Sequence, residues 1–354
     1  MEVVLKVLVT GDRGYIGSVL TSMLLEKSFE VVGYDIDYFS GCDFYQYERA
    51  YKQITKDIRE ISREDIRGFD AIIHLAALSN DPLGELDVNL TEEINYHATL
   101  KLAQLAKEMG IKRFIYSSSQ SMYGISNNDE ALEEDKSEKN PLTAYARTKW
   151  LAECQLKELG NKNFVVVCFR PSTVFGVSPR LRCDIVFNNL VACAYTTGKI
   201  EVKSDGTPWR PVVHVRDVSQ AFIAGLEAPE DIVACQSFNV GIPNGNYTVK
   251  DLATAAQEVV KGSILTFTGE HGADARTYKV SFRKILTKLK DYYKPEWDLI
   301  RGGKELVDNF TKNPFSEEQF RGRNYTRLIQ LKYLIKNKIV DANLRKYGGA
   351  NCEV

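Results

Sequence analysis

The sequence predicts an α/β fold, in which helices cover both faces of a doubly wound parallel sheet and a smaller lobe is attached. Three observations predict this class. Short, continuous apolar runs alternate with helix-period patterns in the first half of the chain, as in sheets that are buried on both faces. The alternation loosens after Pro171. The length of 354 residues also exceeds that of one average domain.

The first half of the chain supplies five strands and three long helices in alternation. The strands are expected at Leu5–Thr10, Phe29–Asp35, Ala71–Leu75, Arg113–Ser117 and Phe164–Phe169. The helices are expected at Tyr15–Glu26, Thr91–Met109 and Thr143–Leu159. Aliphatic and aromatic residues dominate the strands, and each helix carries apolar residues at three- and four-residue spacing. Gly110 and Gly160 follow the last two helices, where glycine commonly ends a helix.

The second half of the chain reads as a lobe interleaved with the sheet. We expect one unit over residues 1–171, with a returning segment near 211–228, and a second unit over residues 172–354. Helices are expected at Asp184–Tyr195 and Val249–Val260. The tail carries an apolar stripe over Tyr325–Lys338, which favours a docked C-terminal helix over an interaction surface.

Composition excludes several classes of protein. The chain has 46 Lys and Arg against 47 Asp and Glu, a net charge of −1, so neither nucleic acid nor a membrane surface is an expected partner. Seven widely spaced cysteines and four histidines form no disulfide or metal-ligand pattern. We therefore expect no metal. With no signal-peptide pattern or membrane span in the sequence, the expected location is the cytoplasm.

A glycine-rich turn follows the first strand and opens the first helix. Gly11, Gly14 and Gly17 have the spacing GxxGxxG, with Tyr15 and Ile16 at the start of the helix. Glycines permit a tight turn and a close approach of the backbone to a pyrophosphate, which the helix N-terminus attracts. In this strand–turn–helix context, the pattern predicts a Rossmann-type domain that binds a dinucleotide.

The residues after the next strands indicate which dinucleotide is bound. Asp35 ends the second strand, 18 residues after Gly17, where a carboxylate binds the ribose hydroxyls and repels a 2′-phosphate. This favours NAD over NADP, although Arg13 is a weaker signal in the opposite direction. Further cofactor contacts are expected from four residues, namely Asp57, Ile58, Ala76 and Ala77.

A tyrosine and a lysine at helical spacing form the catalytic hypothesis. Tyr145 and Lys149 are four residues apart, so they project from one face of a helix. A fixed ammonium beside the phenol would lower its pKa from about 10 and make it a better base. Ser117–Gly124 follows the fourth strand, at the sheet edge that faces the ligand in this fold.

Together these motifs resemble the extended short-chain dehydrogenases/reductases, in the branch of nucleotide-sugar epimerases and dehydratases. The matching stretches are the glycine turn, Asp35, His74–Ala77, Ser117–Gly124, Tyr145 with Lys149, Arg170–Gly176 and Asp205–Val218. The resemblance covers roughly residues 4–300, and the last 50 residues match less well. It implies an NAD-dependent enzyme that acts on a nucleotide-diphosphate sugar, and a homodimer.

The resemblance also implies a role for individual residues. Ser119 matches the catalytic hydroxyl, Tyr145 the base and Lys149 the residue that modulates it and contacts the cofactor. The residues implied to bind substrate are Ser119, Gln120, Asn188, Asn189, Arg210 and Arg276, the two arginines on the diphosphate. His74 and His214 lie in strand motifs and are interpreted as structural.

The chain departs from the family pattern just after Ser119. Dehydratases of this branch carry two acidic residues at the positions that Gln120 and Ser121 occupy in this chain. Neither the glutamine amide nor the serine hydroxyl can exchange a proton near neutral pH. Dehydration is thus disfavoured, as is decarboxylation, which a glutamate supports. The sequence predicts an NAD-dependent epimerase that works through a transient keto-sugar, most often at C4. The alternatives are a nucleotide-sugar 4-dehydrogenase or 4-ketoreductase, and a non-catalytic NAD-sensing regulator.

Overall fold

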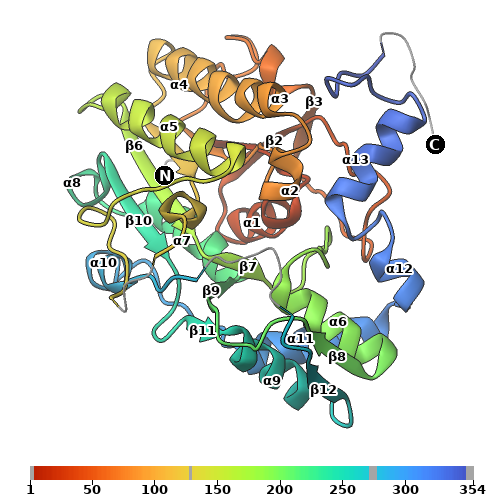
Figure 1. Ribbon diagram of the computed structural model, residues 1–354. Helices are drawn as coiled ribbons and strands as arrows, with labels where there is room; N and C mark the ends of the chain where they lie inside the picture. Colours follow the sequence, from red (N-terminus) through yellow and green to blue (C-terminus); the bar gives the residue numbers. More distant parts are fainter. Residues whose placement is uncertain (1–3, 127–129, 271–276, 348–354) are drawn as a thin grey trace.

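The computed structural model describes residues 4–126, 130–270 and 277–347. Within these residues, a seven-stranded sheet forms the centre (Figure 1), with the order β10-β6-β5-β4-β1-β2-β3 and parallel pairing throughout. Its strands are β1 (Lys6–Thr10), β2 (Glu30–Asp35), β3 (Lys52–Thr55), β4 (Ala71–His74), β5 (Arg113–Ser117), β6 (Val165–Pro171) and β10 (Gln236–Val240). The predicted doubly wound parallel sheet is confirmed.

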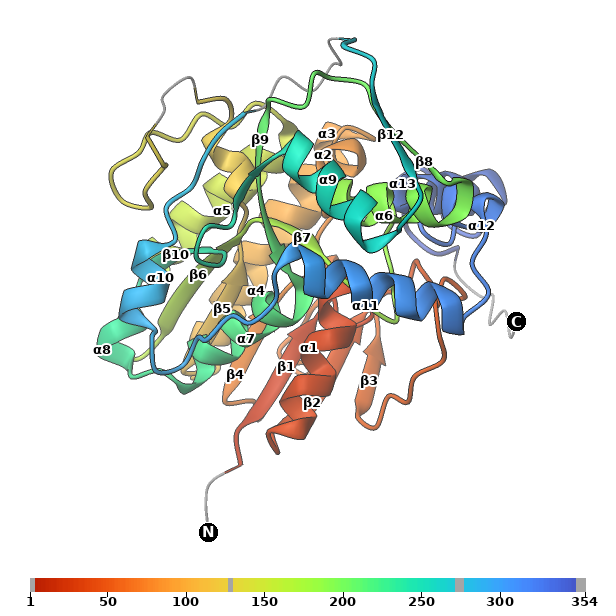
Figure 2. The ribbon, with the colours of Figure 1, turned by 90° about the horizontal axis from the view of Figure 1, so that it is seen from below.

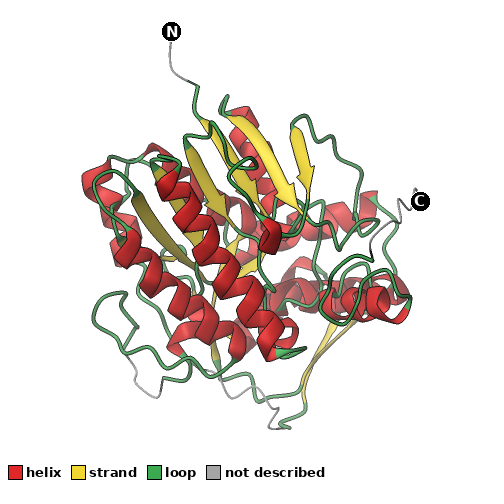
Figure 3. Ribbon diagram, turned by 90° about the horizontal axis from the view of Figure 1, so that it is seen from above, coloured by secondary structure: helices red, strands yellow, loops and turns green. Residues whose placement is uncertain are grey.

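Helices cover both faces of the sheet, as Figure 3 shows. The helices on one face are α1 (Tyr15–Glu26) and α7 (Val215–Glu227), and those on the other are α3 (Val88–Glu92), α4 (Ala98–Glu108) and α5 (Ala144–Leu159). The side chains of a strand alternate between the faces. In β1, Val7 and Val9 pack with the α1 face, whereas Leu8 packs with the α4 face. Burial on both faces explains why these strands are continuously apolar.

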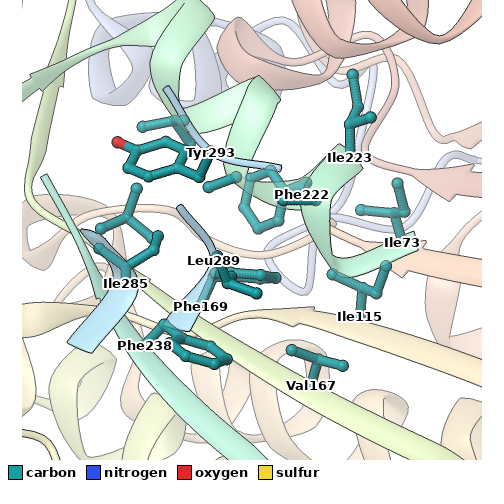
Figure 4. Packing of buried hydrophobic residues seen from close by; sticks show 14 of the residues in the cluster. Ile73, Ile115, Val167, Phe169, Phe222, Ile223, Phe238, Ile285, Leu289 and Tyr293 are labelled. Atoms are coloured by element: carbon teal, nitrogen blue, oxygen red, sulfur yellow. The ribbon is translucent and has the colours of Figure 1, made fainter. Parts of the chain in front are cut away.

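The apolar face beside α7 continues into the second half of the chain. Figure 4 shows Phe169, Phe222 and Phe238 packed together with Ile285 and Leu289. The ring of Phe169 lies 5.7 Å from the ring of Phe222 and 5.7 Å from that of Phe238. Ile285 belongs to α10 (Arg283–Lys288). Late segments of the chain therefore complete the core of the early sheet.

The helix predicted over Thr91–Met109 is divided in the structure. Between α3 and α4 lies a π-helical turn, η2 (Glu93–His97). The amide of Asn95 in this turn accepts a hydrogen bond from the N–H of Leu78 at 2.8 Å and donates to its carbonyl at 3.1 Å. The widened turn thus places a polar side chain where it can fix the loop after β4, as π-turns often do near functional sites.

Two strands of the large sheet, β3 and β10, were absent from the sequence-based prediction. Strand β3 has only four residues and is partly exposed, and β10 mixes polar and apolar residues in Gln-Ser-Phe-Asn-Val. Neither gives the continuous apolar run used to find the other strands. The part of the chain that returns to the sheet therefore extends beyond the expected segment near 211–228. Helix α7 covers one face of the sheet, and β10 then pairs with β6.

A second group of elements lies at the end of the sheet where the parallel strands finish (Figure 2). Among the described residues it contains a sheet of order β11-β9-β7 and a sheet of order β12-β8. Their strands are β7 (Thr173–Phe175), β8 (Lys199–Val202), β9 (Trp209–His214), β11 (Asn246–Thr248) and β12 (Ile264–Phe267). The helices packed with them are α6 (Val186–Thr197), α9 (Val249–Val259), α11 (Leu299–Lys312) and α12 (Glu317–Arg321).

Short elements complete the chain. These are η1 (Ile58–Glu60), α2 (Asp81–Gly84), η3 (Gln120–Tyr123), α8 (Glu230–Val233) and the C-terminal helix α13 (Arg327–Lys336). The docked C-terminal helix predicted over Tyr325–Lys338 is present, with Leu331 and Leu334 buried. Its apolar residues join the core cluster of the large sheet rather than that of the second group.

A buried ion pair joins α5 to the sheet. The carboxylate of Glu153 accepts hydrogen bonds from Arg170 at 2.5 Å, from Ser118 at 2.5 Å and from Ser237 at 2.6 Å. Burial favours the neutral acid, but the Arg170 guanidinium and the two hydroxyls hold the pKa of Glu153 below its usual value. One carboxylate therefore connects α5 to the ends of three strands, β5, β6 and β10.

A close contact fixes the glycine-rich turn against β2. A β-carbon on Gly33 would lie 2.2 Å from the Oδ2 atom of Asp12, so only glycine fits there. Asp12 is fully buried, and its Oδ2 accepts a hydrogen bond from the Tyr51 hydroxyl at 3.0 Å. Burial, and then the nearby Asp35 carboxylate, raise the pKa of Asp12 to about 7.

We expect Glu153→Gln to lower the free energy of unfolding by about 3–5 kcal/mol, because the charge of Arg170 would be left buried without a counter-charge. Urea unfolding at fixed pH and salt measures this effect. Glu158 is exposed on the same helix, so Glu158→Gln is the matched control and should change stability by less than about 0.5 kcal/mol. Equal effects of the two variants would contradict the role given to Glu153.

We expect Asp12 to contribute stability that is lost as the pH rises from 4 to 7. Its pKa of about 7, against 3.8 without burial, means that the folded state binds a proton which the unfolded chain has released, so this contribution decreases through the range. In Asp12→Asn the contribution should be absent, so the free energy of unfolding, measured in urea at several pH values, should fall less or rise more with pH than in the wild type. The exposed Asp308→Asn is the control and should keep the wild-type slope.

Candidate active site

A cavity of about 670 Å³ lies between the C-terminal ends of the large sheet and the second group of elements. This is the edge at which open α/β sheets bind ligands. Nearly all of the residues singled out in the sequence line it. They are Gly11, Gly14, Tyr15, Ile16, Gly17, Asp35, Asp57, Ile58, Ala76, Ala77, Ser119, Gln120, Tyr145, Lys149, Asn189 and Arg210.

The glycine-rich turn has the geometry needed to receive a pyrophosphate. A β-carbon on Gly17 would lie 2.1 Å from the carbonyl oxygen of Gly11, so the helix can approach the turn this closely only with glycine. Gly14 caps α1 and offers no side chain to its first N–H groups. The N-terminus of a 12-residue helix therefore faces the cavity with its backbone donors. These residues fit the phosphates of a dinucleotide.

The end of β2 favours a ribose with two free hydroxyls. The carboxylate of Asp35 accepts hydrogen bonds from the N–H of Asp37 at 2.7 Å and that of Arg13 at 3.2 Å. The Arg13 guanidinium is held by Asp37 at 2.9 Å and by Thr55 at 2.9 Å. Because Arg13 is engaged in this way, its side chain does not offset the repulsion between Asp35 and a 2′-phosphate. The geometry favours NAD.

The other expected cofactor residues form the walls beside Asp35. The Asp57 carboxylate is bound by Arg59 at 2.6 Å and caps η1, so its charge is already satisfied. Ile58 is buried and presents an apolar surface. A β-carbon on Gly11 would lie 2.8 Å from the nitrogen of Ala76, which shows how closely the first turn and the loop after β4 approach. Small residues at Ala76 and Ala77 leave room for a ligand.

Lys149 on α5 lines the cavity and is held in place by a backbone carbonyl. Its ammonium donates to the carbonyl of Ser117 at 2.7 Å, and only 4% of the residue is exposed. Burial lowers the pKa of Lys149 to about 7. The lysine is therefore positioned by the end of β5, next to the serine-rich loop.

Tyr145 lies one helical turn before Lys149 on α5, and it lines the cavity together with Ser119 of the serine-rich loop. The Tyr145 side chain lies near Ser119, which acts to lower its pKa, and the Oγ of Ser119 lies 2.8 Å from the Oγ of Ser121. Burial raises the pKa of Tyr145 to about 12, opposed by Ser119 and by the Arg182 guanidinium. The lowering expected from Lys149 is not among the main influences on this pKa, of which burial is the largest.

Three predicted substrate residues differ in how available they are. Gln120 lines the cavity, but its amide donates to the carbonyl of Arg170 at 3.0 Å and accepts from Ser172 at 3.1 Å. Asn188 does not line the cavity, since its amide is fully buried between the N–H of Gly176 and the carbonyl of Arg182. Asn188 is therefore positioned to hold the loop, and only its neighbour Asn189 reaches the cavity.

The two predicted diphosphate arginines have different outcomes. Arg210 comes from β9 and lines the cavity, with its guanidinium also donating to the carbonyl of Trp209 at 2.9 Å. Arg276 lies outside the described residues.

The two histidines interpreted as structural are both buried. His74 lies between the hydroxyls of Thr10 and Thr99, and His214 stacks on Trp297 at 4.1 Å.

Sequence reasoning missed several residues of the cavity. Arg182 lines it and forms a bidentate pair with Asp184, at 2.8 and 3.0 Å. The signal was the alternation Arg180-Leu-Arg182-Cys-Asp184, in which charged residues precede an apolar helix. Arg327 and Leu331 also line the cavity, although they lie far along the chain in a stripe that predicted only a docked helix.

Two further features, a metal-binding cluster and a membrane-spanning helix, are absent from the described residues. No three His, Cys, Asp or Glu side chains in these parts of the chain form a group that could hold a metal ion. In the same residues, no helix combines the length and the apolar character required to cross a bilayer.

Known proteins with similar sequences are nucleotide-sugar enzymes. UDP-glucose 4-epimerase 1 of Oryza sativa subsp. japonica is 26% identical, over 87% of this chain and 95% of the relative. The dTDP-D-glucose 4,6-dehydratase of Mus musculus is 27% identical, over 87% of this chain and 89% of the relative.

Solved structures share the fold. The UDP-glucuronic acid 4-epimerase of Bacillus cereus, in complex with UDP-glucuronic acid and NAD, matches with a TM-score of 0.73 and 24% identity, over 87% of this chain and 99% of that chain. The profile of one protein family, described as the NAD dependent epimerase/dehydratase family, matches residues 7–241. The match spans more than half of the sequence, and the chain belongs to the NAD dependent epimerase/dehydratase family.

Proposed function

We propose that the protein is an NAD-dependent nucleotide-sugar epimerase that acts through a transient keto-sugar, at C4. One observation carries the proposal. The side chains of Tyr145, Ser119 and Lys149 line the cavity that also contains the glycine-rich turn. This arrangement supplies a base, a hydroxyl that orients the reacting oxygen and a cation, beside a dinucleotide site. Similarity to 4-epimerases such as the rice enzyme supports it.

The cofactor in this proposal is NAD, held by the glycine-rich turn, Asp35 and the walls formed by Ile58 and Ala76. When bound, the cofactor would supply a reversible hydride acceptor for the sugar carbon, so that no net oxidation would result. The chain's contribution is to bind the dinucleotide through backbone N–H groups and to keep water out of a cavity between two packed units.

We propose that Tyr145 removes the proton from the reacting hydroxyl and later gives it back. We propose that Ser119 holds the same oxygen by a hydrogen bond, since Ser119 and Tyr145 line the same cavity and Ser119 acts on the pKa of Tyr145. Burial raises the pKa of Tyr145, so a nearby positive charge is needed before the phenol can act as a base at neutral pH. Lys149, fixed by the Ser117 carbonyl at 2.7 Å, is the residue proposed to provide it.

The proposed substrate is a nucleotide-diphosphate sugar. Arg210 is suited to its diphosphate, because a planar guanidinium forms paired charge-assisted hydrogen bonds with phosphate oxygens. Asn189 lines the same cavity from α6, and Arg276 is proposed as a second diphosphate ligand. The solved relative from Bacillus cereus holds UDP-glucuronic acid together with NAD, which supports this class of substrate.

The carboxylates of the cavity favour epimerisation over dehydration. Gln120 and Ser121 occupy the positions at which a dehydratase needs acids. The described carboxylates in the lining are each held by a donor. Asp35 is held by the N–H groups of Asp37 and Arg13, Asp57 by Arg59, Asp81 by Thr143 and Asp184 by Arg182. Acids held in this way are poorly suited to transfer protons to a leaving hydroxyl.

We further propose that residues 1–171 with the returning segment bind the cofactor, and that most of residues 172–354 bind the sugar nucleotide.

We also propose that the protein is a homodimer located in the cytoplasm. The dimer follows from family resemblance. The cytoplasm is supported by six free cysteines among the described residues, which suit a reducing compartment. The balanced net charge supports the absence of a nucleic-acid or membrane partner.

The purified protein should convert one of the UDP-, GDP-, CDP- or dTDP-sugars into an isomer without added cofactor. The reason is that an epimerase regenerates its own NAD in each turnover. Chromatography of the sugar nucleotides, with NAD(H) assayed in the protein as purified, measures this. Production of NADH in proportion to sugar consumed would overturn epimerisation in favour of a dehydrogenase.

Tyr145→Phe should reduce turnover by about 10²–10⁴-fold, because the variant lacks the group that transfers the proton. Binding of NAD should be nearly unchanged, since the ring remains in place. Rates from the isomer assay and a titration with NADH test both parts. Tyr116→Phe is the control, because the buried Tyr116 hydroxyl has no hydrogen-bond partner among the described residues and does not line the cavity. Wild-type rates in Tyr145→Phe would sink the mechanism.

A further inference from the structure

The C-terminal segment, defined as residues 326–347, packs beside the strands that carry the cofactor residues. Figure 1 shows its helix α13 next to α2. Leu331 and Leu334 of α13 belong to the same buried apolar cluster as Tyr34, Ile58 and Leu83. Tyr34 precedes Asp35, and Ile58 follows Asp57. The segment therefore covers the β2 and β3 side of the sheet, where the adenosine half of NAD is expected.

Hydrogen bonds fix the segment to the loops that follow β2 and β3. Gln330 donates to the carbonyl of Tyr38 at 3.0 Å, and the Tyr38 hydroxyl donates to the carbonyl of Leu344. Arg59, which also binds Asp57, donates to the carbonyl of Asn343 at 2.9 Å. The end of the chain is thus connected to both loops that line this part of the cavity.

Arg327 brings a buried cation to the cavity from this segment. It lines the cavity, is 2% exposed, and lies over the ring of Phe39 at 4.1 Å. Its Nη2 donates to the carbonyl of Arg180 at 2.7 Å, whereas its buried Nη1 has no hydrogen-bond partner in the described residues. Burial, and then the charge of Arg182, lower the pKa of Arg327 to about 10.

The neighbouring arginines differ from Arg327 in their partners. Arg180 is paired with Asp37 at 3.2 Å and Asp43 at 2.9 Å, and Arg182 with Asp184 at 2.8 Å. No ion pair of the Arg327 guanidinium with a carboxylate occurs within the described part of the chain. A buried charge with an unused N–H is unfavourable unless an anion pairs with it. The arrangement therefore points to a ligand that carries negative charge.

We propose that the C-terminal segment is the outer wall of the NAD site and that Arg327 donates a hydrogen bond to a phosphate of the dinucleotide. The inference rests on NAD as the proposed cofactor. Arg327 and Gly14 line the same cavity. The aromatic ring under the Arg327 guanidinium belongs to Phe39, four residues after Asp35. The substrate diphosphate has its own candidate, Arg210, on β9 in a separate sheet. The dinucleotide phosphates are thus the anion that the observations favour.

Binding measurements with Arg327→Met test the proposal. Titration calorimetry with ADP-ribose should show affinity about 10- to 100-fold weaker than in the wild type, because a charge-assisted hydrogen bond is lost. Affinity for adenosine, which has no phosphate, and for UDP should be unchanged. Arg327→Lys should recover part of the loss. Weakened UDP binding with normal ADP-ribose binding would overturn the proposal and make Arg327 a substrate ligand.

Arg321→Met is the matched control. Arg321 ends α12, is exposed, pairs with Glu317 at 2.9 Å and does not line the cavity, so its removal should leave all affinities unchanged. Circular dichroism and the melting temperature of each variant show whether the chain has folded. If wild-type protein does not bind ADP-ribose or NAD, the proposed cofactor is wrong. If it binds both and Arg327→Met binds them equally well, only the role of Arg327 fails.

Discussion

The ion pair between Glu153 and Arg170 holds together the parts on which the site depends. Tyr145, Lys149 and Glu153 follow one another at four-residue spacing on α5, so fixing Glu153 fixes the helix rotation that directs the other two side chains. The Glu153 carboxylate binds Ser118 after β5, Arg170 in β6 and Ser237 in β10. The serine-rich loop and the helix with the tyrosine therefore keep one relative position. A charged group inside the core is unfavourable by itself. Here the buried carboxylate fixes the position of α5 relative to the serine-rich loop.

The sequence predicted the parts of the fold that depend on local burial. Strands buried on both faces, such as β1 and β6, gave continuous apolar runs, and the helical period of α1 gave its bounds correctly. Strands β3 and β10 were missed because both mix polar with apolar residues, and β3 is in addition partly exposed. The π-turn η2 was missed because its cause is tertiary, namely the contact of Asn95 with Leu78. Periodicity contains no information about such a contact.

The candidate site was predictable where chemistry is tied to local sequence. The glycine spacing, Asp35 and the tyrosine–lysine pair gave residues that line one cavity. Asn188 and Asn189 are adjacent, yet only Asn189 reaches the cavity, because the direction of a side chain depends on the packing of α6. Arg182 and Arg327 come from a loop and a tail without a recognised motif. Their positions depend on the folded chain, which also explains why burial, rather than Lys149, dominates the pKa of Tyr145.

The cavity takes its walls from both extremes of the polypeptide. Gly11 to Gly17 come from its beginning, and Arg327 and Leu331 from its end. These two walls come together only in the folded chain, so a molecule that touches both of them binds the folded form. Such a ligand shifts the folding equilibrium toward that form. The lifetime of the folded protein in a cell is therefore coupled to the supply of the molecule that fills this cavity.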